Sequence, residues 1–122
     1  MSRVIRFDLG IDEPARARAF YSSVFEWRIE NVEGVPDYWV VTTGDSGAPG
    51  IDGALVQRRY PTQSTMCWIA TPSLDEAMQK IAEHGGKNVT PRTNVPGYGD
   101  YAIAQDTEGN VFGVIQLREP GT

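Results

Sequence analysis

The chain has 122 residues, 40 % of them hydrophobic, which is enough for one compact domain with a buried core. Its 11 basic and 16 acidic residues give a formal net charge of −5, and the basic residues form no run, so a nucleic acid partner is excluded. No stretch approaches 18 apolar residues, which excludes a membrane partner, and the single cysteine excludes an internal disulfide.

The first strand is predicted at the N-terminus, where apolar and polar residues alternate. Ile5, Phe7 and Leu9 are expected to pack under a helix, so Arg6 and Asp8 face the opposite side of the sheet. Two interpretations of this polar pair stay open. It is either a solvated face with a mutual ion pair, or a substrate contact in which Arg6 binds an anion and Asp8 acts as orienter or base.

Two amphipathic helices are predicted from apolar residues at i, i+3, i+4, i+7 and i+8, in residues 17–25 and 74–82. Asp12 is the expected N-cap of the first helix. Ser73, with Glu76 three residues later, predicts a capping box at the start of the second.

Each helix is preceded by one predicted strand and followed by three, so the order strand, helix, strand, strand, strand occurs twice. The strands are expected at residues 3–9, 28–32, 38–43 and 54–57, then at 66–70, 87–89, 101–105 and 111–117. Periodicity alone therefore predicts the α+β class, with one domain over residues 1–122 that contains a first module, 1–60, and a second module, 61–122.

Several short motifs accompany these elements. They are an acidic-Pro-x-Arg-Ala start at 13–17, Phe-Tyr at 20–21, Phe-x-Trp at 25–27, Gly-Gly at 85–86, and a closing turn, Asp-Thr-Glu-Gly-Asn, at 106–110. With them the chain resembles the vicinal oxygen chelate superfamily, which contains glyoxalase I, extradiol dioxygenases and bleomycin resistance proteins. Within it, the chain looks most like the small bacterial glyoxalase-like proteins.

The resemblance covers nearly the whole chain and carries several expectations. It implies two tandem βαβββ modules that form an open, cup-shaped mixed sheet around a ligand cleft. It also implies a homodimer, in which two chains complete two clefts. With no signal peptide pattern at the N-terminus and a single cysteine, we expect a soluble cytoplasmic protein.

Metal-dependent members of the superfamily bind their ion through His and Glu side chains from strands of both modules. On this resemblance the two histidine positions fall on Arg6 and Met66, and the closing glutamate position falls on Gly113. The remaining glutamate is expected within residues 38–60, which contain no Glu or His. The resemblance therefore predicts no metal site of the usual kind, and we expect no cofactor.

Other reactive residues are few. The sole histidine, His84, falls at the end of the second helix, where a capping or surface role is expected. Cys67 is expected to point under that helix beside Ile69, as a buried structural thiol. The sequence assigns no catalytic residue.

The other residues expected to line the predicted cleft are aromatic or apolar. Met66 and Trp68 share one strand face, Tyr98 lies in a predicted loop at 90–100, and Trp39 or Tyr101 is expected to join them from other strands. Such a surface binds a flat or extended organic ligand by burial and stacking, although core packing is an alternative for each aromatic residue. The predicted ligand-binding residues are Arg6, Asp8, Trp39, Met66, Trp68, Tyr98, Tyr101 and Gly113.

Two main functions stay open on these grounds, beside a weaker third one, a module that serves a protein partner. The first is a metal-independent protein that binds a small molecule without chemistry, as the bleomycin-resistance branch does. The second is an enzyme, either a glyoxalase-like lyase or isomerase with a displaced metal or a metal-free acid–base catalyst. The missing ligand positions favour binding.

Overall fold

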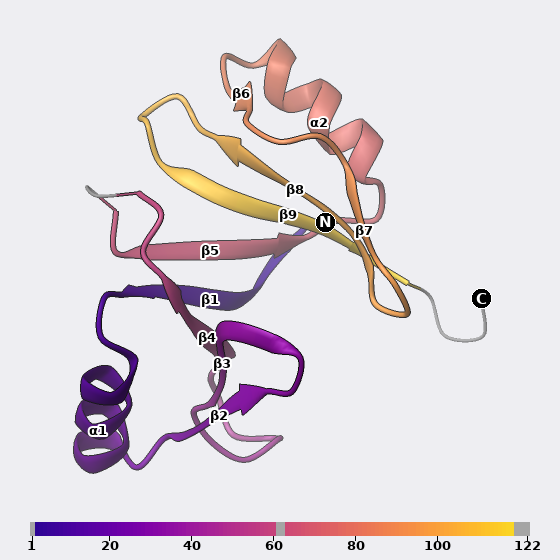
Figure 1. Ribbon diagram of the computed structural model, residues 1–122. Coiled ribbons are helices and arrows are strands. Elements are labelled where there is room, and N and C mark those ends of the chain that lie inside the picture. Colours follow the sequence, from indigo (N-terminus) through magenta and orange to yellow (C-terminus); the bar gives the residue numbers. More distant parts are fainter. Residues whose placement is uncertain (1, 61–62, 119–122) are drawn as a thin grey trace. The chain divides into compact units, whose positions relative to one another are not determined.

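The computed structural model describes residues 2–60 and 63–118, which fall into two compact units (Figure 1). The first unit is Arg6–Met66, and the second unit is Met1–Ile5 together with Cys67–Thr122. The start of the chain thus belongs with the second unit, unlike in the predicted modules. Within the described residues, no helix has the length and apolar character needed to cross a bilayer.

The first unit has the predicted order of elements. It contains β1 from Arg6 onward, followed by one helix and three strands: β1 (Arg3–Ile11), α1 (Pro14–Phe25), β2 (Arg28–Val32), β3 (Val35–Thr42) and β4 (Asp52–Gln57). The strands lie in the order β2-β3-β4-β1. β1 runs parallel to β4 and the other pairs are antiparallel, so the sheet is mixed.

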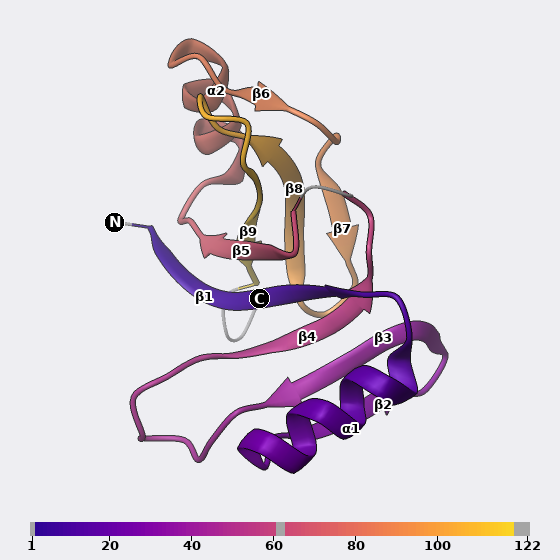
Figure 2. The ribbon, with the colours of Figure 1, turned by 90° about the vertical axis from the view of Figure 1, so that its left-hand side faces the viewer.

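The core of the first unit forms between α1 and its sheet (Figure 2). Its buried members are Ile11, Ile29, Val41 and Leu55, one from each strand. Phe7 packs against them, and the alternation of side chains along β1 therefore puts Arg6 and Asp8 on the other face, as the sequence predicts.

Close approach of β1 to β4 depends on Gly53. It lies opposite Phe7 in the parallel pair, and a Cβ at Gly53 would overlap the carbonyl oxygen of Phe7 and lie 2.7 Å from its ring. The missing side chain leaves room for the phenyl ring, which joins the core.

The apolar stripe of α1 is only partly covered. Ala17 and Tyr21 pack against the core, and the ring of Tyr21 stacks on that of Trp27 at 4.9 Å. Phe20, Val24 and Phe25 are each more than half exposed. The helix therefore presents an apolar surface that its own sheet does not bury.

Asp12 does not cap α1, so this prediction is wrong. The N-cap is Glu13, whose side chain makes no capping bond, and Pro14 takes the first helical position. The carboxylate of Asp12 instead forms an ion pair with Arg58 at 3.3 Å, and the helix begins one residue later. Proline suits that position because it has no N–H to be left without an acceptor.

The second unit adds a strand to the predicted order. Its elements are β5 (Thr65–Ala70, from Cys67 onward), α2 (Leu74–Glu83), β6 (Lys87–Asn88), β7 (Thr93–Val95), β8 (Gly99–Gln105) and β9 (Val111–Leu117). The strands lie in the order β5-β9-β8-β6, with β7 also paired to β8, and β5 is parallel to β9. Much of the predicted loop at 90–100 is therefore a β-hairpin.

The predicted N-cap of α2 is confirmed at Ser73. The hydroxyl of Ser73 accepts a hydrogen bond from the N–H of Glu76 at 3.2 Å, and Gln116 Oε1 accepts one from the N–H of Leu74. Both bonds satisfy donors that the first turn of a helix leaves without partners.

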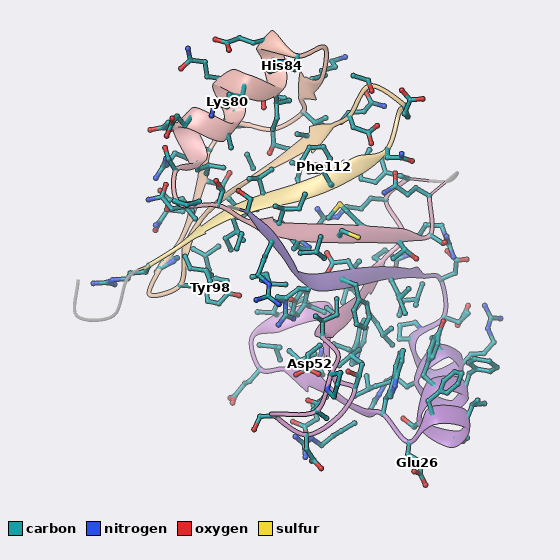
Figure 3. The ribbon with its side chains drawn as sticks, turned by 180° about the vertical axis from the view of Figure 1, so that it is seen from behind. Glu26, Asp52, Lys80, His84, Tyr98 and Phe112 are labelled. Atoms are coloured by element: carbon teal, nitrogen blue, oxygen red, sulfur yellow. The ribbon has the colours of Figure 1, made fainter. Side chains whose placement is uncertain are left out.

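The core of the second unit lies beneath α2 (Figure 1). Leu74, Ala102 and Val114 are its buried members. Because α2 packs on β6, β8 and β9, Cys67 on β5 is exposed, so the prediction of a buried thiol is wrong. His84 caps the end of α2 and is exposed, as expected (Figure 3).

The closing turn has the predicted chemistry. Asp106 Oδ1 accepts hydrogen bonds from the N–H groups of Glu108 and Asn110, at 2.8 and 2.9 Å, and Gly109 supplies a positive φ of 86°. The two backbone donors, that of Asn110 first, hold the pKa of Asp106 below its ordinary value. The turn joins β8 to β9 in register.

We expect Gly53→Ala to destabilise the fold by about 1–3 kcal/mol, because the new methyl group must displace Phe7 from the core. Urea unfolding followed by circular dichroism measures this change. Gly44→Ala is the matched control, since no atom lies within 4 Å of a Cβ at that position. Equal stability of the two variants would contradict the role given to Gly53.

Candidate functional site

Two aromatic side chains of the second unit, those of Trp68 and Tyr101, lie on the sheet face opposite α2. Phe112 and Val114 pack toward α2, so Gly113 between them faces the other way, and Tyr101 faces away from its buried neighbour Ala102 for the same reason. Trp68 is opposite Gly113 in the parallel pair of β5 and β9. These residues come from three strands.

Gly113 has a direct physical role on this face. A Cβ built on it would overlap the six-membered ring of Trp68, so the indole occupies the space that any side chain at position 113 would need. Tyr101 meets Trp68 edge to face, with ring centroids 5.5 Å apart and planes at 74°. The structure thus brings together Trp68, Tyr101 and Gly113, which we call the Trp68 surface.

Tyr98, the other aromatic residue predicted for the cleft in this unit, lies in a turn. It is at the tip of the hairpin between β7 and β8, 44 % exposed (Figure 3). Its N–H donates to the carbonyl of Val95, which closes the turn, and its own carbonyl accepts from Arg118.

The hairpin is fixed by a network that sequence reasoning missed. Arg92 donates from Nε to Asp100 at 2.7 Å and from Nη1 to Asp75 in the first turn of α2 at 2.9 Å, while Asn94 donates to the other oxygen of Asp100. Hydrogen bonds from Asn94 and Arg92 lower the pKa of Asp100, and those to Asp100 and Asp75 raise the pKa of Arg92. Arg92 therefore links the hairpin, through Asp100, to the first turn of α2. The single sequence gave no signal for this, because the three charged partners are far apart along the chain.

The remaining predicted residues belong to the first unit. Arg6 donates from Nη2 to the carbonyl of Gly53 at 3.1 Å, Asp8 is buried at 9 % exposure, and Met66 is half-buried at the start of β5. Trp39 lies elsewhere. It is opposite Leu55 in the register and packs against the core, so it is on the face away from Asp8.

Asp8 is the charged side chain with the least exposure among the described residues. Removal of a carboxylate from water costs free energy unless partners satisfy it, and Asp8 is not without an interaction partner. Ala54, which is opposite Asp8 on the paired strand β4, has no exposed surface.

The residues present do not fit the usual metal of the superfamily. At position 113 the indole of Trp68 fills the space of a ligand, and Arg6 and Met66 supply no imidazole. Within residues 2–60 and 63–118, no three His, Cys, Asp or Glu side chains are grouped as a metal would require.

Comparison with known proteins gives the family. The profile of the Glyoxalase/Bleomycin resistance protein/Dioxygenase superfamily matches residues 3–114, so the chain belongs to this superfamily. No curated protein sequence matches it.

Solved structures share the fold at low sequence identity. A superfamily member from Vibrio splendidus 12B01 aligns with a TM-score of 0.70 and 13 % identity, over 97 % of this chain and 100 % of its own. A hypothetical protein from Bacillus halodurans C-125 aligns with a TM-score of 0.70 and 10 % identity, over 99 % of this chain and 98 % of its own. A Streptomyces coelicolor methylmalonyl-CoA epimerase variant, in complex with 2-nitronate-propionyl-CoA, aligns with a TM-score of 0.69 and 10 % identity. The alignment covers 96 % of this chain and 98 % of the epimerase chain. The predicted fold class, α+β with the mixed sheet of this superfamily, is confirmed.

We expect Gly113→Glu to gain no stoichiometric zinc or nickel and no glyoxalase activity, because the carboxylate must displace Trp68 and finds no imidazole at positions 6 or 66. Mass spectrometry of the dialysed protein measures the metal, and the indole N–H resonance of Trp68 measures the displacement. Gly44→Glu, in open space, is the control and should leave that resonance in place. Metal-dependent turnover in Gly113→Glu would contradict the assignment of position 113.

Proposed function

We propose that this protein binds an organic small molecule without a metal ion, at the Trp68 surface. The proposal rests on one observation, which is that the indole of Trp68 occupies the space of a side chain at position 113. The position that carries a metal ligand in metal-dependent relatives has become the support of an aromatic platform.

The chemistry of the platform favours a planar, apolar ligand. Trp68 and Tyr101 offer ring faces and edges for stacking, and the buried Ile103 and Ile115 continue the same sheet face, since they are opposite Gly113 and Tyr101 in the register. Within the first unit, we propose Arg6 and Asp8 as polar ligand-binding residues.

An enzyme of the same superfamily is the second candidate, and the burial of Asp8 favours it. In that case Asp8 transfers a proton as a metal-free acid–base group, in a lyase or isomerase reaction. The solved methylmalonyl-CoA epimerase structures show that the fold accommodates an epimerase, although at about 10 % identity they carry no residue assignment to this chain.

We also propose a cytoplasmic homodimer. The exposed thiol of Cys67 fits a reducing compartment. The exposed apolar residues of α1, Phe20, Val24 and Phe25, favour burial against a second chain, because soluble monomers rarely leave a continuous apolar patch of this kind in water.

We expect 2-naphthol, a neutral planar probe, to bind metal-free protein and to perturb the indole N–H resonance of Trp68. Trp68→Ala should weaken binding by roughly tenfold or more, since loss of one stacking aromatic costs about 1–3 kcal/mol. Val89→Ala, which truncates an exposed apolar side chain outside α1, is the control and should bind as the parent does. Binding that requires added zinc, or that survives Trp68→Ala, would contradict the proposal.

We expect Phe25→Glu to convert the dimer to a monomer of 13.4 kDa, because a carboxylate within a buried apolar contact is costly. Light scattering after size-exclusion chromatography measures the mass. Val89→Glu changes a similarly exposed apolar residue outside α1 and should remain dimeric. A parent protein that is already monomeric would overturn the dimer.

A further inference from the structure

The second unit contains an open groove of about 980 Å³ that is separate from the Trp68 surface. The start of β1, the segment between β5 and α2, the hairpin of β7 and β8, and the end of β9 line it. All of its lining residues belong to the second unit.

Two lining residues show that the groove reaches the sheet face that carries α2. Gln116 accepts the N–H of Leu74 at the start of the helix, so its side chain lies on that face. Asp100 is directly opposite Gln116 in the register, and it reaches α2 through Arg92. Tyr101 is on the other face, so a ligand in this groove need not contact the Trp68 surface.

The charges around the groove are opposite in sign to the average of the chain. Three arginines, Arg3, Arg92 and Arg118, line it with one carboxylate, Asp100, whereas the whole chain carries a net charge of −5. A local excess of guanidinium groups on an acidic protein marks a place where an anion is attracted.

Arg92 is held in place before any ligand arrives. Asp100 and Asp75 fix its guanidinium from two sides, at 2.7 and 2.9 Å. A guanidinium has five N–H donors, so two carboxylate contacts do not exhaust it. An arginine that is already ordered loses less entropy when it binds an anion.

Apolar side chains complete the wall. Ile5, Val95, Pro96 and Leu117 line the groove, and Val95 and Leu117 are 37 % and 41 % exposed. A volume of this order accommodates a small organic molecule. The lining therefore offers an apolar body contact and a cationic end within one hollow.

We propose that this groove is a second binding site, which takes a small organic anion whose phosphate or carboxylate group is bound by Arg3, Arg92 and Arg118. The site is independent of the proposed function at Trp68. Arginine binds both kinds of anion through paired N–H donors, so the two sources share one chemistry.

The test is a titration of ¹⁵N-labelled protein with phenyl phosphate and with benzoate, and with neutral benzamide as the probe without charge. We expect saturable shifts at groove amides, such as those of Thr71, Gly97 and Arg118, with one or both anions and none with benzamide. The indole resonance of Trp68 should not move. Whichever anion binds more tightly identifies the anionic group.

Variants make the assignment specific. Arg3→Gln and Arg118→Gln should each weaken binding by about tenfold, since a hydrogen bond to a charged group contributes roughly 1.5–3 kcal/mol. Arg28→Gln is the control, because Arg28 lies on β2 of the first unit with its side chain 70 % exposed. Unfolding curves of all three establish that they fold.

Three results would overturn the site. The first is the absence of any saturable shift up to roughly 10 mM anion, which is ten times a millimolar dissociation constant. The second is equal binding of benzamide, and the third is equal weakening of anion binding in Arg28→Gln. Each is distinct from failure of the proposed function, which is measured with neutral 2-naphthol at Trp68.

Discussion

The close approach of an aromatic ring to a glycine, across a parallel pair of strands, is the contact on which each unit depends. In the first unit Phe7 lies where a side chain at Gly53 would be, and in the second unit Trp68 lies where a side chain at Gly113 would be. The two contacts serve different ends. Phe7 packs into the core beneath α1, whereas Trp68 lies on the sheet face away from α2. A glycine thus leaves room for a core residue in the first unit and for an aromatic residue on the opposite sheet face in the second.

Carboxylate side chains hold several loops in place through hydrogen bonds, so the net charge alone does not describe the binding surface. Asp52 accepts from the N–H and the hydroxyl of Thr43 and so closes the connection between β3 and β4. Asp106 organises the final turn, and Asp100 holds the hairpin through Arg92. Because these acidic groups are engaged within the chain, a charge of −5 does not describe a uniformly acidic binding surface. The groove lined by three arginines shows how local charge departs from the total.

Membership of the superfamily fixes the fold more firmly than the function. Solved relatives at 10–13 % identity superimpose over nearly the whole chain, which shows how little sequence the architecture requires. Activity in such a fold depends on the side chains that the strands present. The resemblance places the metal-ligand positions on Arg6, Met66 and Gly113, and in the structure the ring of Trp68 occupies the space that a side chain at position 113 would need. The proposed functions rest on the Trp68 surface and on the buried Asp8.

The sequence by itself determined the local elements: the period of each helix, the Ser73 cap, the Asp106 turn and most strand positions, because each depends on neighbours within a few residues. It also indicated the superfamily, and it showed Gly113 at the position where the resemblance expects a glutamate. Only the tertiary structure decided why that glycine is there, that Cys67 is exposed, and that residues 93–95 pair with β8 instead of forming part of a loop. Only it brought Asp75, Arg92 and Asp100 together, since contacts between residues 8 and 17 positions apart are set by strand register and helix packing, which no local pattern specifies.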